Sequence, residues 1–146
     1  MLSNTCKYGI RALLYLAANA EKDKAIGIKK ISQDLGIPTP FLGKILQSLA
    51  RHKILFSSKG PHGGFGLNRP ADSITLLDII QIIDGNDVLD QCLICLKSCN
   101  EVDEESRLCP IHERYNDIRR QIYQLFNEQT VGSVIREMQN KSGVSI

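Results

Sequence analysis

The chain contains no tryptophan, and aromatic residues make up only 5% of its 146 residues. It has no run of about 18 apolar residues, so we expect no transmembrane helix and no contact with a membrane. The residues from Met1 to Lys7 lack the charged and then apolar order of a secretory signal. These absences lead us to expect a cytoplasmic protein. In that reducing compartment, cysteines bind metals or react more often than they form structural disulfides.

The hydrophobic fraction of 42% is sufficient for a core, and a chain of this length forms one domain or one small domain with an extension. Its net charge of +2 is unevenly distributed. Residues 1–70 contain 11 Lys or Arg and 3 Asp or Glu, a net charge of +8; residues 71–146 contain 7 and 13, a net charge of −6. A basic half of this size favours a polyanionic partner, most commonly nucleic acid. A lysine-rich surface that meets only water is the alternative.

Hydrophobic periodicity predicts three helices in the basic half, over residues 5–20, 28–35 and 40–52. Gly36 is placed to cap the second helix at its C-terminus. The Ile-Pro-Thr-Pro sequence that follows is a tight turn in which Thr39 can cap the third helix. Two short helices joined by such a turn describe a helix-turn-helix, in which the second helix reads DNA.

The third predicted helix has an apolar side and a polar side. Its polar side carries Lys44, Gln47 and Arg51. We predict that Lys44 and Arg51 bind DNA phosphates, and that Thr39 and Gln47 make polar contacts with the DNA. The apolar stripe, which we expect to be buried, consists of Phe41, Leu42, Ile45, Leu46 and Leu49.

Two short strands are predicted directly after this helix, over residues 54–58 and 65–68. The Lys-Gly-Pro-His-Gly-Gly sequence between them is a glycine-rich turn, so the whole arrangement is a winged helix. Glycines let such a turn approach a DNA backbone closely, where Lys59 and Arg69 can pair with phosphates. His62 can contact a phosphate or the minor groove, or face water. The turn is not a phosphate-binding loop, because it lacks the following helix and the Lys-Ser/Thr pair.

The acidic half begins with a fourth predicted helix, residues 74–84, and ends with a long helix from Ile111 and a short one that Thr130 can cap. We interpret the long helix as a dimerisation helix, because the winged domain has little surface left to bury its apolar stripe. A helix folded back onto its own core is the alternative. The stripe steps by four and three residues, like a coiled-coil seam, and consists of Ile111, Tyr115, Ile118, Ile122 and Leu125.

Four of the five cysteines lie within 18 residues, in the segment between these helices, and His112 comes three residues after the last of them. Thiolates are soft ligands for zinc, copper(I) and iron–sulfur clusters, so the pattern favours a metal or a redox centre. The Cys-x2-Cys pair is not repeated, which argues against an ordinary zinc ribbon. A segment of this length without periodicity is functional or disordered, and its cysteine content favours function. The four cysteines are Cys92, Cys95, Cys99 and Cys109.

These features together resemble the Rrf-type bacterial winged-helix regulators, a family that includes the iron–sulfur regulator IscR and the nitric-oxide sensor NsrR. The resemblance covers nearly the whole chain, and the wing sequence is its most specific part. It rests on residues 8–13 (Tyr-Gly-Ile-Arg-Ala-Leu), 31–49 (the helix-turn-helix), 59–65 (Lys-Gly-Pro-His-Gly-Gly-Phe) and 75–80 (Thr-Leu-Leu-Asp-Ile-Ile), and on the cysteine segment before a long helix.

The resemblance implies a mainly α fold with a small β-hairpin, built as a winged helix-turn-helix plus a long C-terminal dimerisation helix. We expect a DNA-binding domain over residues 1–85, a cysteine-bearing sensor loop over 86–110, and the dimerisation and C-terminal helices over 111–146. It also implies a homodimer on double-stranded DNA with a near-palindromic site. The expected function is that of a transcriptional regulator, a repressor, and not of an enzyme.

Several members of the family carry a two-iron or four-iron cluster on three cysteines of this loop and a fourth, variable ligand. Cys92, Cys99 and Cys109 match the three cysteines, and His112 matches the histidine just beyond them. The chain departs from the pattern in two ways. The gap before Cys109 is lengthened by an acidic insertion, and Cys95 is an additional thiol that competes as a ligand. A thiol–disulfide sensor, or a zinc sensor without iron, is therefore the alternative.

Two other interpretations are disfavoured. An enzyme with Cys109 as nucleophile and His112 as base would need an oxyanion hole, for which the sequence has no evident group. A module that only docks proteins would not need the basic half. Cys6, on the first predicted helix, is interpreted as a buried free cysteine rather than a ligand.

Overall fold

The computed structural model describes residues 2–19, 24–91 and 110–141; the four clustered cysteines lie outside these residues. The described chain is mainly helical, with one antiparallel two-stranded hairpin, as the sequence predicts. In chain order, its helices and strands are α1 (Asn4–Asn19), α2 (Ile28–Leu35), α3 (Thr39–Arg51), β1 (Leu55–Ser58), β2 (Gly64–Leu67), α4 (Leu76–Asp84), α5 (His112–Glu128) and α6 (Val131–Asn140), with short 3-10 turns at η1 (Ala71–Ser73) and η2 (Asn86–Leu89).

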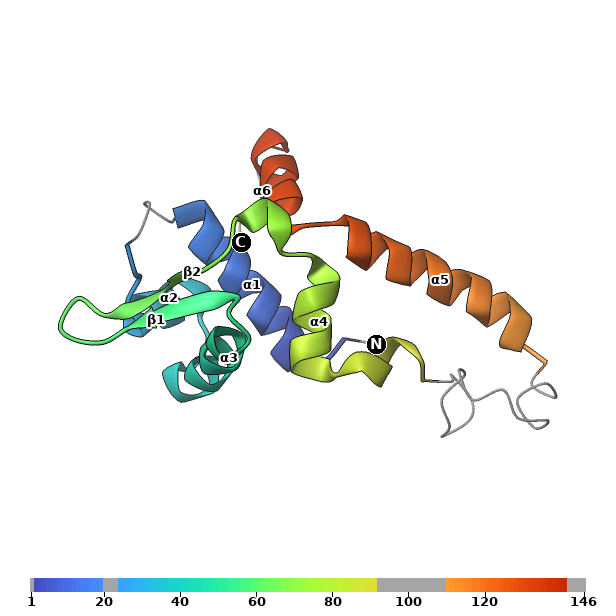
Figure 1. Cartoon of the computed structure of the whole chain (residues 1–146), viewed down its shortest axis with the longest axis horizontal. Helices are drawn as coiled ribbons and strands as arrows, with labels where there is room; N and C mark the ends of the chain where they lie inside the picture. The colour runs from blue at the N-terminus through green and yellow to red at the C-terminus, as the bar shows by residue number, and fades with distance from the viewer. Residues whose placement is uncertain (1, 20–23, 92–109, 142–146) are drawn as a thin grey trace.

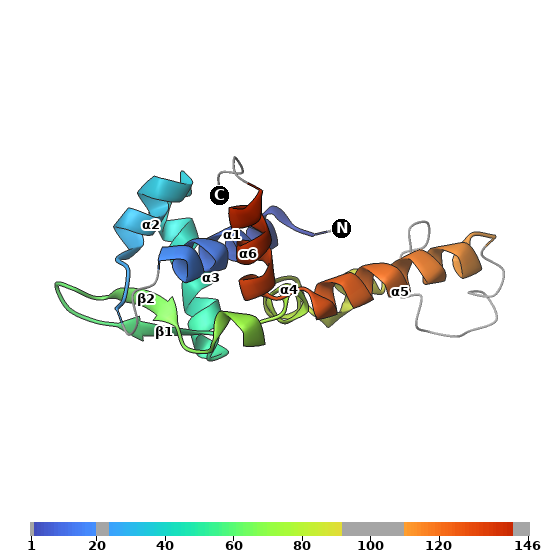
Figure 2. The same ribbon diagram turned by 90° about the horizontal axis from the view of Figure 1, so that it is seen from above.

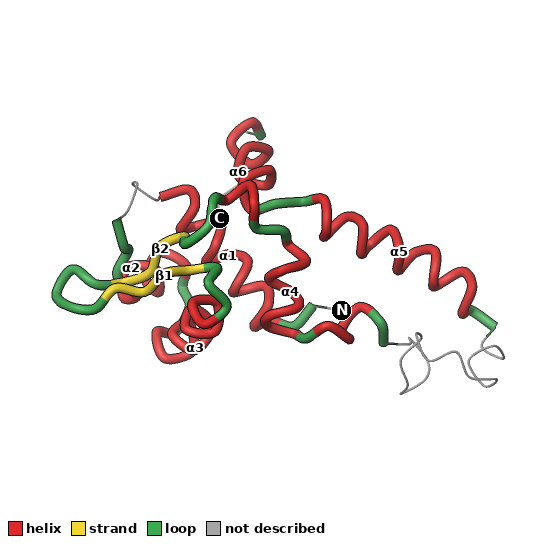
Figure 3. Tube along the Cα trace, in the orientation of Figure 1, coloured by secondary structure: helices red, strands yellow, loops and turns green. Residues whose placement is uncertain are grey.

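The molecule is elongated, and its two ends carry different elements (Figures 1 and 2). The hairpin projects from one end and the uninterrupted helix α5 from the other, with the remaining helices between them (Figure 3). Helix α1 contacts α2, α3, α4, α6 and β2, so the core forms around it. In the part of the chain that is described, no helix is long and apolar enough to cross a membrane. Large, fully buried core side chains include Leu13, Leu16, Ile31, Leu42, Leu46 and Ile79.

Strand β2 of the hairpin is hydrogen-bonded along both of its edges. Its strands pair with Leu55 opposite Leu67 and Ser58 opposite Gly64. On the other edge of β2, Ile26 and Phe65 exchange two backbone hydrogen bonds of 2.9 and 3.0 Å. A Cβ atom at Gly64 would collide with the Ile26 backbone, so the close approach of these two segments requires glycine at this position. The wing is thereby fixed to the body of the domain at its base.

Helix α4 begins later than predicted. The sequence placed its start at Ile74, but Ala71–Ser73 form a 3-10 turn and the helix begins at Leu76. Thr75 is the N-cap: its hydroxyl accepts a hydrogen bond from the backbone N–H of Asp78, and the Asp78 carboxylate accepts one from the backbone N–H of Thr75. This reciprocal capping box satisfies two N–H groups that the helix itself leaves unpaired.

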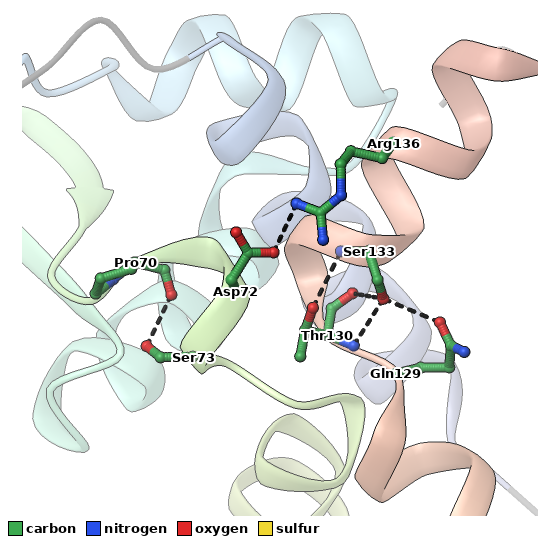
Figure 4. Close-up of polar contacts among 7 residues, drawn as sticks. All are labelled: Pro70, Asp72, Ser73, Gln129, Thr130, Ser133 and Arg136. Carbon is green, nitrogen blue, oxygen red and sulfur yellow. Dashed lines mark hydrogen bonds and ion pairs between the residues drawn. The ribbon is translucent and has the colours of Figure 1, made fainter.

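The C-terminal end of α5 is fixed to the body of the domain where α6 begins (Figure 4). The backbone N–H of Leu76 donates to the Gln129 carbonyl over 2.9 Å, and that of Val131 donates to the Ile74 carbonyl over 2.9 Å. Thr130 caps α6 as predicted, in a second capping box. Val131 is fully buried, so the anchor is apolar as well as hydrogen-bonded. The direction of α5 is therefore set by the start of α4.

A side-chain network joins α1 to the helix-turn-helix. The hydroxyl of the buried Tyr15 donates to Asp34 on α2 over 2.5 Å, and Lys30 reaches the same carboxylate oxygen over 2.9 Å. The hydrogen bond from Tyr15, followed by that from Lys30, lowers the pKa of Asp34. Burial, followed by the bond to Asp34, raises the pKa of Tyr15. The pair therefore consists of a neutral phenol and a charged carboxylate at neutral pH.

Candidate nucleic-acid interface and sensor site

The polar side of α3 is presented to solvent. Lys44, Gln47 and Arg51 are exposed, and their spacing of three and four residues places them on one face of the helix. The opposite face is anchored by four buried residues of the predicted stripe. A helix held in this way, with cations and an amide along its free face, has the form that enters the major groove of DNA. The four buried residues are Leu42, Ile45, Leu46 and Leu49.

The prediction that Thr39 caps α3 is wrong. Pro38 occupies the N-cap position without a side-chain hydrogen bond, and Thr39 is already helical. The Thr39 hydroxyl donates to the hydroxyl of Ser32 over 2.9 Å, and Ser32 donates to the Ile37 carbonyl over 2.6 Å. Thr39 thus joins α2 to α3 and fixes the angle between the two helices of the helix-turn-helix.

The prediction that Phe41 is buried is wrong. Its side chain is 38% exposed, and its ring meets the edge or face of Tyr8 at 90° with 5.7 Å between centroids. It lies in the first turn of α3. Together with Lys44 and Ser48 it lines a small hollow of about 210 Å³ that α4 closes on the other side.

A groove runs between the recognition helix α3 and the wing. It has a volume of about 510 Å³, and Gln47 and Arg51 line it from α3 while Ser57 lines it from β1. Lys59 and His62, in the turn beyond β1, are both exposed. His62 also lines a second hollow, of about 640 Å³, between the wing and the chain before α2. Of the predicted contacts, Gln47 and Arg51 therefore line the groove between α3 and the wing, whereas His62 lines the second hollow.

Two further cations come directly before and after the hairpin in the chain. Lys53, which sequence reasoning did not single out, occupies the turn between α3 and β1 with a left-handed φ of 59°. Its carbonyl accepts a hydrogen bond of 3.0 Å from the Asn68 amide, which holds this turn. The position of Lys53 in the sequence, between the predicted third helix and the first strand of the wing, could have identified it as a candidate contact. Arg69, by contrast, donates to the Ser73 carbonyl over 2.7 Å and so stabilises the turn before α4.

The described residues that flank the cysteine segment contact each other. The Tyr115 hydroxyl on α5 donates to the Gln91 carbonyl over 3.4 Å, and Arg119 lies 3.5 Å from the carboxylate of Asp90. The two flanks of residues 92–109 are therefore held together by α5. Among the described residues, no group of three or more His, Cys, Asp or Glu could hold a metal ion. Of the predicted ligands, His112 alone falls within them.

His112 is the first residue of α5 and is half-buried. Its Nε2 lies 2.8 Å from the side-chain nitrogen of Asn116, one turn later on the same face. The Oδ1 atom of Asn116 is buried and has no hydrogen-bond partner. Sequence reasoning missed Asn116, whose only signal was its spacing of four residues from a candidate ligand.

Cys6 is a buried free cysteine, as predicted. Its side chain is fully buried in α1, and burial, the nearby negative charge of Asp84 and a hydrogen bond to Asp84 raise the pKa of its thiol to about 12. Asp84 is held there by Ser3, whose backbone N–H donates to it over 2.8 Å. Cys6 is therefore a neutral thiol and lacks the thiolate that metal binding requires.

One side of α5 exposes apolar residues. Ile118 and Leu125, seven residues apart on the predicted seam, are each 53% exposed, and α5 has no fully buried residue. The helix also packs on α4. The alternative considered from the sequence was that α5 folds back onto the core of its own chain. In the described chain, the contacts of α5 with that core leave Ile118 and Leu125 about half exposed. An apolar stripe of this kind is typical of a surface that meets a partner.

Comparison with known proteins gives a consistent family. The model of the Rrf2 family, described as iron-dependent transcriptional regulator, matches residues 2–137. A protein of Aquifex aeolicus, described as an HTH-type transcriptional regulator, is 32% identical over 135 residues, which cover 92% of this chain and 91% of that protein.

Two solved structures share the fold. CymR, the global cysteine regulator of B. subtilis, superposes with a TM-score of 0.77 at 20% identity, covering 94% of this chain and 97% of that one. IscR of T. potens superposes with a TM-score of 0.72 at 18% identity, covering 100% and 93%.

Proposed function

Because the chain belongs to the Rrf2 family of DNA-binding transcriptional regulators and is not an enzyme, we propose that it is a dimeric repressor whose DNA affinity is controlled by its cysteine segment. The observation that carries the proposal is the exposed face of α3, which presents Lys44, Gln47 and Arg51. Gln47 and Arg51 also line the groove between α3 and the wing. In this proposal α3 enters the major groove, and Lys59 and His62 follow the DNA backbone. We place the protein in the cytoplasm, where its target DNA lies.

We propose that two copies associate through α5. A two-fold dimer presents two recognition helices about 34 Å apart, one turn of double-stranded DNA, and so binds a near-palindromic site. The half-exposed side chains of Ile118 and Leu125 support this interface. Helix α5, which carries both, extends from the end of the molecule opposite the wing, so an interface on α5 leaves α3 free for DNA (Figure 1).

We propose that Cys92, Cys99 and Cys109, with His112, hold an iron–sulfur cluster of the two-iron or four-iron type. Three thiolates and one imidazole form a donor set that suits such a cluster, and the cluster, when bound, supplies a redox-sensitive centre. The half-buried ring of His112 lies beside Asn116, whose buried amide has one atom without a hydrogen-bond partner, so a polar group that can orient the imidazole is present. The description of the Rrf2 family as iron-dependent supports iron as the metal.

Coupling to DNA would pass through α5. The helix holds the two flanks of the cysteine segment at its first turns and is hydrogen-bonded to the start of α4 at its last. A change in the segment therefore alters α5 and, through the α5 interface, the spacing of the two recognition helices. Such a change is a population shift between states that bind DNA well and poorly.

A zinc or thiol–disulfide sensor is the second candidate. Cys95 favours it, because this additional thiol gives the segment four thiolates, which suit zinc, or two pairs that can oxidise. Colour separates the candidates, since an iron–sulfur protein prepared without air is brown whereas the zinc and thiol forms are colourless.

Replacing Lys59 by alanine is expected to weaken binding to all DNA sequences alike. Each phosphate contact contributes about −0.9 to the slope of log affinity against log salt, so the slope should become flatter by roughly one unit. The measurement is a salt titration of DNA binding. Lys141→Ala, which removes the same charge from the end of α6, is the control and should leave the slope unchanged. A slope unaltered by Lys59→Ala would mean that the wing does not touch the DNA backbone.

A further inference from the structure

The contact between His112 and Asn116 determines which ring nitrogen of a neutral His112 carries the proton. The side-chain nitrogen of Asn116 lies 2.8 Å from Nε2 of His112, a normal hydrogen-bond distance. With the amide in this orientation, Asn116 donates and Nε2 accepts, so a neutral imidazole carries its proton on Nδ1. The amide oxygen of Asn116 is then buried without a partner, and among the described residues it is the one buried side-chain atom in that condition.

Rotating the Asn116 amide by 180° exchanges its oxygen and nitrogen with almost no change in shape. The oxygen then accepts a hydrogen bond from Nε2–H of His112. The imidazole consequently has a free lone pair on Nδ1. The buried position that held the oxygen now holds an N–H donor instead of an acceptor.

The two orientations have opposite consequences for metal binding. In the first, Nε2 is occupied by Asn116 and Nδ1 carries the proton, so neither nitrogen of a neutral His112 can bind a metal. In the rotated orientation Nδ1 is available. Metal-binding histidines almost always donate their other ring N–H to an oxygen acceptor, which is the part that Asn116 would play.

We propose that Asn116 is the positioning residue of the sensor site, which holds His112 as the Nε2–H tautomer and presents its Nδ1 as the ligand nitrogen. The proposal rests on the proposed function in one respect, namely that His112 is a ligand of the centre. It assigns to Asn116 both the orientation of the ring and the choice of nitrogen. In this orientation the buried amide oxygen of Asn116, which has no partner in the other orientation, accepts the hydrogen bond from His112.

The tautomer is measured in the metal-free protein by ¹⁵N chemical shifts of the His112 ring at a pH where the imidazole is neutral. We expect protonated Nε2 and unprotonated Nδ1. Protonated Nδ1 would overturn the proposal. Because this measurement needs no iron, it decides the inference even if the wild-type protein proves unable to bind a cluster, a result that would instead refute the proposed function.

Three variants test the consequence for iron. Asn116→Leu removes the acceptor and should weaken iron retention against a chelator by roughly 10- to 100-fold, the usual effect of losing a residue that orients a metal ligand. Asn116→Asp keeps an acceptor oxygen in the same place and should retain iron as the wild type does. Asn127→Leu makes the same chemical change at an exposed position of α5 and should also have no effect.

Two results would overturn the proposal: iron retention in Asn116→Leu equal to that of the wild type, or equal losses in Asn116→Leu and Asn116→Asp. Circular dichroism of each variant reports whether α5 is intact. If Asn116→Leu proves unfolded, the wild-type tautomer and the Asn116→Asp variant still decide the outcome.

Discussion

Replacing Ile118 and Leu125 together by aspartate is expected to convert the protein from a dimer to a monomer. Each side chain is 53% exposed in the single chain, so the substitutions cost a monomer little stability, whereas in the proposed interface they would bury four unpaired charges per dimer. Losing the second recognition helix removes the gain from simultaneous binding of two half-sites, which amounts to roughly 10²- to 10⁴-fold in affinity. Sedimentation measures the first effect and binding to a near-palindromic site the second.

The matched control introduces the same two charges on the opposite side of the helix, as Gln124→Asp with Asn127→Asp. Both of these positions are exposed, and neither belongs to the apolar stripe. The control should sediment as a dimer and bind DNA as the wild type does. An intact dimer after Ile118→Asp with Leu125→Asp would show that α5 does not form the interface, and the protein would then use another surface.

Single replacement of Cys92, Cys99 or Cys109 by serine is expected to abolish the iron–sulfur cluster, because each removes one of three thiolates for which a hydroxyl is a poor substitute. Cys95→Ser should retain the cluster. Each variant is reconstituted without air and analysed for iron and sulfide. The loss should be nearly complete for the three ligands, which makes this the largest expected effect on the sensor.

Cys6→Ser serves as the control for cysteine replacement in general. Its thiol is fully buried and its raised pKa keeps it neutral, so the variant should keep the full iron content. If Cys95→Ser abolishes the cluster while Cys99→Ser keeps it, the three ligands are wrongly assigned. If the wild type binds zinc but no iron, the zinc sensor replaces the cluster.

The helix-turn-helix and the wing could be predicted from the sequence because their signals are local. Four side chains of the predicted apolar stripe of α3 are buried. Gly36 caps α2 in the left-handed conformation, with a φ of 65°. The wing follows from a glycine-rich turn between two short runs of strand-forming residues. Its requirement for glycine at position 64, however, comes from the backbone of Ile26, a contact that is distant in sequence.

Other features depend on packing that periodicity does not describe. Phe41 fits the apolar stripe but lies in the first turn of α3, where its ring meets Tyr8 and its side chain remains 38% exposed. Helix α4 begins after Thr75 and not at Ile74, because the Thr75–Asp78 capping box fixes its start although the apolar run begins at Ile74. A Thr-x-x-Asp pattern was available in the sequence to locate that start.

The chemistry proposed for the sensor site comes from the sequence, whereas the residues that support His112 come from the structure. Cysteine content and spacing favour a metal or redox centre, and the resemblance to a family singles out His112. The amide of Asn116 becomes meaningful only when its distance to the imidazole and its buried oxygen are known. Likewise, the contact of Tyr115 with Gln91 links the flanks of the cysteine segment through a side chain that the seam pattern placed in the dimer interface.

The most direct test of the proposed control is the DNA affinity of one protein preparation, measured before and after its iron is removed by a chelator, at one fixed salt concentration. We expect the two affinities to differ by roughly 5- to 150-fold, the usual range of coupling between two sites. Iron and sulfide analysis of the same samples confirms which state is measured. Equal affinities for the iron-loaded and iron-free dimers would contradict control of DNA binding by the cluster.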